Sequence, residues 1–174
     1  MPERNIYEGM SALDFRYYDP DVAGFLSEEA FIWAKCQVEI ALVRAFVRTG
    51  MCDQAVLDEI VAACREVRAE EVYAEEGITR HDIRALVNCI QRRVSERARP
   101  FVHMMATSYD IVDTANAYRW TRVMEQVVAP ALIDLERILL QLAIREAATP
   151  QIGRTHGQHA VPVTFGFFLA NYVH

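Results

Sequence analysis

The sequence has 174 residues, of which 52% are hydrophobic, so it is long and apolar enough to bury a core and is not a disordered tail. Its formal net charge of −6 argues against nonspecific nucleic-acid binding, since no basic stripe could neutralise a run of phosphates. No basic leader precedes an apolar segment, and no apolar run reaches membrane-spanning length. We therefore expect a cytoplasmic protein that binds neither nucleic acid nor membranes.

The first part of the chain predicts an extended lead-in followed by two helices. Residues 1–26 carry scattered proline and glycine without a sustained hydrophobic period. Ser27 is a good N-cap for a first helix, whose apolar positions recur at helical spacing until Thr49 and Gly50. Asp53 is placed to cap a second helix that ends near residue 67.

The remainder predicts a third helix and then a long helical stretch. The third helix is expected over residues 82–98, and Pro100 ends it. Residues 110–148 favour helix throughout, apart from a kink or division at Pro130. A helix of about 39 residues would span about 58 Å at about 1.5 Å per residue, so it needs partner helices. Residues 149–162 are expected to form a loop, another helix is expected from residue 164, and no strand is predicted.

His81 stands between Arg80 and Asp82 at the start of the third predicted helix. Backbone N–H groups and the helix dipole favour anions at such a position, which makes His81 a candidate anion contact. The alternative is that Asp82 caps the helix and His81 is an ordinary surface residue. Local sequence leaves both interpretations open.

His103 precedes two adjacent hydroxyl residues, Thr107 and Ser108, which stand just before a predicted helix. Two hydroxyls and the backbone N–H groups beside them can bind a carboxylate. Alternatively, one of the two is only the N-cap of the helix. The two roles are compatible with each other.

His156 and His159 flank Gly157 and Gln158 in the glycine-containing loop. The spacing could form half of a metal site, but no Asp, Glu or Cys lies nearby, so we predict no metal. An unperturbed imidazole titrates near neutral pH, which suits His156 to general acid catalysis. His159 is as compatible with a structural role as with a functional one.

Five segments in order resemble motifs of the adenylosuccinate lyase family, in the fumarase/aspartase superfamily. They are Arg16-Tyr17 with Pro20, Val38-Glu39, Thr79-Arg80-His81-Asp82, His103 with the run from Thr107 to Thr114, and Gly153-Arg154-Thr155-His156-Gly157-Gln158-His159-Ala160. The resemblance covers the chain from about residue 16 to its last residue. Members of this family are far longer than 174 residues, so we expect the front part of such an enzyme.

The resemblance implies an all-α fold in two parts. Residues 1–106 would form a small N-terminal helical domain, and residues 107–174 would begin a central helical bundle that is incomplete here. It also implies a homotetramer in which three subunits contribute to each active site.

The implied reaction is a cofactor-free β-elimination that releases fumarate from a succinyl-amine. His156 would be the general acid, and the implied substrate-binding residues are Arg16, Tyr17, Arg80, His81, Asp82, His103, Thr107, Ser108 and Gln158. The family's general base is a serine on a loop with an SSxMPxKxNP-like signature, which does not occur in residues 1–174. The chain alone is therefore expected to be inactive.

Met105 departs from the family pattern, because glycine is usual at this position of the HxGxTS motif. This leaves a sister enzyme open, such as a 3-carboxymuconate cycloisomerase or a lyase for another amine. A noncatalytic helical interaction module is a further alternative. The retained histidines argue against it.

Overall fold

The computed structural model describes residues 6–9 and 17–173. The chain divides into two compact units, Met1–Val123 and Met124–His174. The domain boundary predicted near residue 106 stays a prediction. Among the described residues, no helix is both long and apolar enough to cross a membrane.

The regular elements of the first unit are all helices within its described residues. Its elements are η1 (Ile6–Glu8), α2 (Pro20–Leu26), α3 (Glu28–Arg48), α4 (Gln54–Glu66), α5 (Ala69–Thr79), α6 (Asp82–Gln91), η2 (Arg99–Phe101) and α7 (Ser108–Val123). The two predicted N-caps are confirmed. Ser27 Oγ accepts the Ala30 N–H at 3.3 Å, and the Asp53 carboxylate accepts the Val56 N–H at 3.2 Å.

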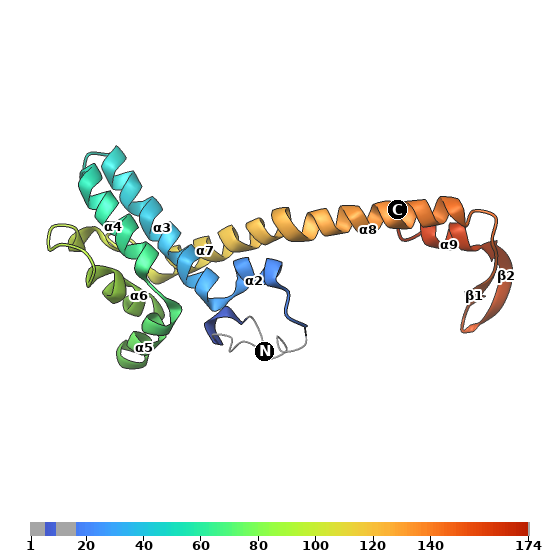
Figure 1. Ribbon diagram of the computed structural model, residues 1–174, viewed down its shortest axis with the longest axis horizontal. Coiled ribbons are helices and arrows are strands. Elements are labelled where there is room, and N and C mark those ends of the chain that lie inside the picture. Colours follow the sequence, from blue (N-terminus) through green and yellow to red (C-terminus); the bar gives the residue numbers. More distant parts are fainter. Residues whose placement is uncertain (1–5, 10–16, 174) are drawn as a thin grey trace. The chain divides into compact units, whose positions relative to one another are not determined.

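The core of this unit lies where the apolar faces of α3, α4 and α6 meet (Figure 1). These helices contribute the fully buried side chains Cys36, Val43, Ile60, Leu86 and Ile90. α7 packs on α2 and α3, and α5 packs on α6. The apolar positions that recur at helical spacing in the sequence therefore mark the faces that these helices bury in the core.

Two predictions for this unit are wrong in detail. Residues 20–26 form α2 instead of an extended segment, because Asp19 accepts two N–H groups of the first turn and Pro20 suits its start. α6 ends at Gln91, well before residue 98. The N–H of Ser95 donates to Glu59 Oε2 at 3.0 Å, which takes a donor that a longer helix would use itself.

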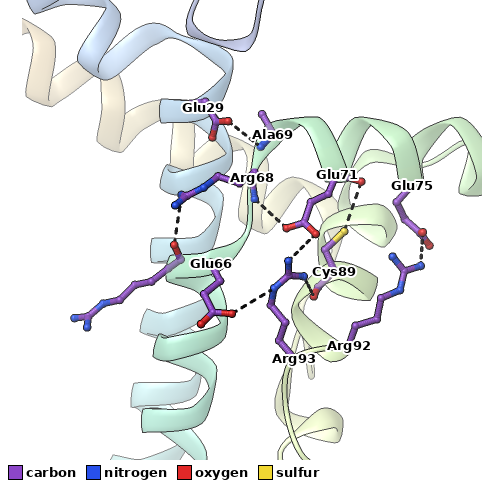
Figure 2. Close-up of polar contacts among 10 residues, drawn as sticks. Glu29, Glu66, Arg68, Ala69, Glu71, Glu75, Cys89, Arg92 and Arg93 are labelled. Carbon is purple, nitrogen blue, oxygen red and sulfur yellow. Dashed lines mark hydrogen bonds and ion pairs between the residues drawn. The ribbon is translucent and has the colours of Figure 1, made fainter. Parts of the chain in front are cut away.

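Side-chain contacts tie α5 to its neighbours (Figure 2). Arg93 of the α6–η2 turn donates to Glu71 Oε2 at 2.8 Å and to the Cys89 carbonyl at 3.0 Å. Glu71 also accepts the Arg68 N–H at the start of α5, and Glu29 of α3 accepts the Ala69 N–H at 3.2 Å. No element was predicted for this segment. These contacts fix the helix whose end leads into the Arg80 turn.

The second unit contains a π-helical turn, two helices and two strands. They are η3 (Met124–Val128), α8 (Ala129–Arg145), β1 (Pro150–Thr155), β2 (Gln158–Thr164) and α9 (Phe165–Ala170). Pro130 lies in the first turn of α8, directly after the π turn, so the predicted division of the long helix at Pro130 is confirmed. The helix predicted from residue 164 is also confirmed, with Thr164 as its N-cap.

The segment predicted as a loop is instead an antiparallel hairpin, with β1 paired to β2. Its two-residue turn is formed by His156 and Gly157, both at positive φ (52° and 74°), as a type I′ turn requires. Register shifts by one residue near Gly153, where an added Cβ would lie 2.8 Å from the Val161 carbonyl oxygen. Most strand residues are at least partly exposed, so the sequence lacks the alternation that reveals strands.

Candidate functional site

Two oppositely charged residues lie one turn apart on the buried face of α3. Lys35 is 5% exposed and Glu39 is 0% exposed, although the neighbouring positions of this face are apolar. Residues at this spacing share one side of a helix. Charged side chains are rarely buried unless they are paired. The partners of Lys35 and Glu39 therefore show which segments of the chain this face of α3 contacts.

Lys35 holds the start of α6. Its Nζ lies 3.3 Å from Asp82 Oδ2, and it also lies over the Phe31 ring at 4.2 Å from the centroid. Asp82 is the first residue of α6. The predicted substrate-binding carboxylate is therefore anchored to α3 by an ammonium group.

Glu39 holds His103. Glu39 Oε2 accepts the His103 backbone N–H at 2.9 Å, and Oε1 lies 2.8 Å from the ring Nδ1. Burial raises the pKa of the Glu39 carboxyl, and the hydrogen bonds from His103 oppose this rise. A site predicted from the sequence thus depends on a carboxylate 64 residues earlier in the chain.

His81 links the starts of two helices. Its Nδ1 accepts the Arg84 N–H at 3.2 Å, so His81, not Asp82, is the N-cap of α6. Its Nε2 lies 3.3 Å from Ser108 Oγ, at the start of α7. The alternative is wrong in that Asp82 does not cap the helix, but His81 is exposed, as that alternative expected. The His81 ring also lies 3.6 Å from Asp82 Oδ1. Arg80, before His81, is exposed and left-handed, with φ of 54°.

Thr107 is bonded within its own loop. Asp110 Oδ2 accepts the Thr107 N–H at 2.7 Å and the Thr107 hydroxyl at 2.9 Å. The Thr107 N–H, followed by the hydroxyl, holds the pKa of Asp110 below its usual range. Asp110 is the third residue of α7. In a capping box the side chain at this position accepts the N–H of the N-cap residue, and the contact between Asp110 and Thr107 is this half of the motif. The predicted carboxylate-binding role for the Thr107–Ser108 pair stays a prediction.

The loop before Thr107 has an unusual backbone. His103 and Met105 both lie in the left-handed region, with φ of 61° and 63°. Met105 is 83% exposed and so has little packing that could offset this conformation. Glycine adopts this region freely. Met105 therefore keeps the backbone conformation that glycine favours, at a conformational cost.

In the second unit, the predicted acid His156 is exposed at the hairpin turn, and Gln158 begins β2 directly after it. Arg154 pairs with His159 across the strands. These two residues line an open hollow of about 710 Å³ that also includes Phe167 and other residues of β1, β2 and α9. The hairpin thus presents polar side chains beside an apolar helix.

The remaining predicted residues are placed as follows. Tyr17 is 71% exposed, and Arg16 lies outside the described residues. In the first unit Lys35 contacts Asp82, Glu39 contacts His103, and His81 contacts Ser108. α3 thus holds residues of two predicted motifs from positions one turn apart. The residues in the described ranges include no group of three or more His, Cys, Asp or Glu side chains placed to hold a metal.

Sequence reasoning missed Lys35 as a site residue and assigned no role to Glu39. The signal was present, because both interrupt the apolar stripe of the first predicted helix at i, i+4 spacing. A pair of opposite charges within such a stripe indicates buried groups that need partners elsewhere.

The chain belongs to the lyase family, whose family model, described as lyase, matches residues 22–174. It is similar to the adenylosuccinate lyase of Methanocaldococcus jannaschii, with 34% identity over 160 residues, covering 91% of this chain and 34% of that protein. The adenylosuccinate lyase of Pyrococcus horikoshii is 37% identical over 160 residues, 91% of this chain and 35% of that protein. The resemblance found in the sequence is confirmed.

Solved structures of two enzymes share the fold. The fumarate lyase from Mesorhizobium sp. BNC1 has a TM-score of 0.79 and 30% identity, covering 89% of this chain and 37% of that one. The 3-carboxy-cis,cis-muconate lactonizing enzyme from Pseudomonas putida has a TM-score of 0.85 and 26% identity, covering 93% and 37%. The chain spans about a third of the length of these relatives.

Proposed function

We propose that this chain supplies part of the active site of a lyase that releases fumarate from a succinyl-amine, and that the enzyme is an adenylosuccinate lyase of purine synthesis. One observation carries the proposal: proteins named adenylosuccinate lyase are 34–37% identical to the chain over 91% of its length. The contacts of His81 with Ser108 and of His103 with Glu39 support it, because these predicted site residues have defined polar partners.

The proposed reaction breaks one C–N bond. A base removes the proton on the carbon β to the nitrogen, and the adjacent carboxylate carries the developing negative charge. Fixed hydrogen-bond donors stabilise that charge, for which we propose the Gln158 amide and the Ser108 hydroxyl. Both donors of Thr107 are bonded to Asp110, so its part is to hold the start of α7. The C–N electron pair leaves with the nitrogen, which takes a proton from His156. The products are the amine and fumarate, and no cofactor takes part.

The general base is not proposed among these residues. The serine-loop signature that the resemblance assigns to it does not occur in residues 1–174. We therefore expect no fumarate from the purified 174-residue chain incubated with adenylosuccinate, followed by absorbance at 240 nm. Turnover by this chain alone would contradict the assignment of the base.

The role of His156 is tested in the encoded protein at its full length, called the complete enzyme below. His156→Gln should lower kcat by about 10²–10⁴-fold with a modest effect on KM, because a general acid acts in the transition state. His159→Gln is the matched control, since it makes the same change three residues along the same hairpin. Equal and small effects of both substitutions would remove His156 from the mechanism.

A sister enzyme is the second candidate. The likeness to the muconate lactonizing enzyme, with a TM-score of 0.85, and the residue Met105 favour it. Activity of the complete enzyme on adenylosuccinate, compared with a 3-carboxymuconate substrate, decides between the two. A homotetramer with active sites shared by three subunits, and a cytoplasmic location, are also proposed. They come from the family resemblance and the composition of the chain.

A further inference from the structure

Glu39 is a fully buried carboxylate whose two oxygens are both used by one residue. Oε2 accepts the His103 N–H at 2.9 Å, and Oε1 lies 2.8 Å from the ring Nδ1. A buried carboxylate is costly unless it is paired and hydrogen-bonded. The core around Glu39 would be satisfied more simply by an apolar side chain. Its presence therefore points to a requirement at His103.

The contact decides how the imidazole ring is presented. An ionised carboxylate can only accept hydrogen bonds, so the nitrogen that faces it carries a proton. The second ring nitrogen, Nε2, has no protein hydrogen-bond partner within residues 6–9 and 17–173. The side chain of His103 is 19% exposed. The ring is thus held from its buried side, and Nε2 is left for another molecule.

The same carboxylate also fixes the backbone. His103 lies at φ of 61°, a region that non-glycine residues rarely adopt. The bond from its N–H to Glu39 holds this conformation while the second bond holds the ring. Rotation of the side chain and relaxation of the loop are opposed by one group on a rigid helix.

We propose that Glu39 is a positioning residue that keeps the proton of His103 on Nδ1 and thereby presents Nε2, as a hydrogen-bond acceptor, to an O–H or N–H group of the bound substrate. The identity of that substrate rests on the function proposed above. The position of the ring proton does not. Two experiments separate these statements.

The first experiment measures the ring proton directly in the wild-type 174-residue chain. Long-range ¹H–¹⁵N spectra of the histidine rings, with His103 assigned from the spectrum of His103→Gln, distinguish the two neutral tautomers. We expect the neutral ring to carry its proton on Nδ1, and Glu39→Gln to place a substantial share on Nε2. A neutral wild-type ring protonated on Nε2 would overturn the proposal without reference to catalysis.

The second experiment uses the complete enzyme. Glu39→Gln should raise KM about tenfold, equivalent to about 1.4 kcal/mol, with kcat changed by less than about threefold. In a His103→Gln background, Glu39→Gln should cause no further rise, because its effect passes through that ring. Glu39→Asp, which keeps the charge, should recover part of the loss.

Glu75→Gln is the matched control for the second experiment. Glu75 is the other buried carboxylate of the described residues, and its partners Arg92 and Asn88 are not among the predicted site residues. This substitution should lower the melting temperature and leave KM unchanged.

Additive effects of Glu39→Gln and His103→Gln on KM would reduce Glu39 to a structural residue. If the wild type releases no fumarate from any succinyl-amine, the proposed function fails, and the tautomer still decides the role of Glu39.

Discussion

Met105 is a non-glycine residue in a backbone conformation that favours glycine. It lies at φ of 63° with 83% of its surface exposed, so it bears the cost of a left-handed backbone without compensating burial. Its neighbour Met104 is half-buried and packs against the core. Methionine in place of the usual glycine at position 105 thus adds a side chain, while the backbone keeps a conformation that glycine adopts freely.

Met105→Gly should therefore stabilise the first unit. Relief of the left-handed strain exceeds the added entropy of the unfolded chain by about 0.5–1 kcal/mol, or a few degrees in Tm. Thermal melting followed by circular dichroism measures this. The control is Met104→Gly, which should lower the melting temperature because it removes a packed side chain. A lower Tm for Met105→Gly would mean that Met105 makes contacts which its exposure does not indicate.

The same substitution tests the substrate. If the complete enzyme is an adenylosuccinate lyase that tolerates Met105, Met105→Gly should leave kcat/KM for adenylosuccinate within a few-fold, which is the outcome we expect. If Met105 shapes a pocket for another succinyl-amine, the wild type should be poor on adenylosuccinate, and the glycine variant better by about tenfold, or about 1.4 kcal/mol. Steady-state kinetics on both proteins decides this.

The packing of α9 on α8 depends on a single glycine. An added Cβ on Gly166 would lie 2.3 Å from the Ala143 carbonyl oxygen and 2.7 Å from the backbone of Ala147. The Gly166 N–H donates to the Glu146 carbonyl at 2.9 Å, so the start of α9 is bonded to the end of α8. Here backbone meets backbone, and no side chain can move aside.

Gly166→Ala should separate α9 from α8. We expect the amides of Phe165 and Gly166 to lose protection in hydrogen exchange, because both donate to carbonyls at the end of α8 or just after it. Gly77→Ala is the matched control, since Gly77 is in α5 with nothing within 4 Å of an added Cβ. It should stabilise the first unit by about 0.5–1 kcal/mol. Unchanged protection in Gly166→Ala would show that the helices can adjust.

At the scale of the whole molecule, α8 stands out because none of its residues is buried. Its exposed apolar side chains include Leu132, Ile133, Leu135, Ile138, Leu140 and Ile144. Apolar patches of this kind on a protein indicate a surface that associates with another. This agrees with the expectation that the helices after residue 110 need partners.

The 174-residue chain should therefore self-associate or bind a hydrophobic dye. Sedimentation velocity at several concentrations, together with dye fluorescence, measures both properties. The double variant Leu135→Lys, Ile138→Lys should reduce both, because lysine keeps helix propensity while it adds charge to the apolar surface. A monomer that binds no dye at any concentration would refute the expected association.

The sequence by itself determined the features that depend on neighbours along the chain. Ser27 and Asp53 cap helices and Pro130 marks a division, since each acts within about one turn of its own position. The order of the family motifs could also be read from the sequence, because it does not depend on the three-dimensional structure. All of this follows from local backbone chemistry and periodicity.

Only the tertiary structure decided which groups meet. Glu39 and His103 are 64 residues apart, and His81 and Ser108 are 27 apart, so no local pattern could pair them. The early end of α6 depends on Glu59, a carboxylate of another helix. The hairpin around His156 likewise lacked an alternating pattern, because its strands bury little. In each case the deciding partner is brought near by packing, and packing is a property of the folded chain.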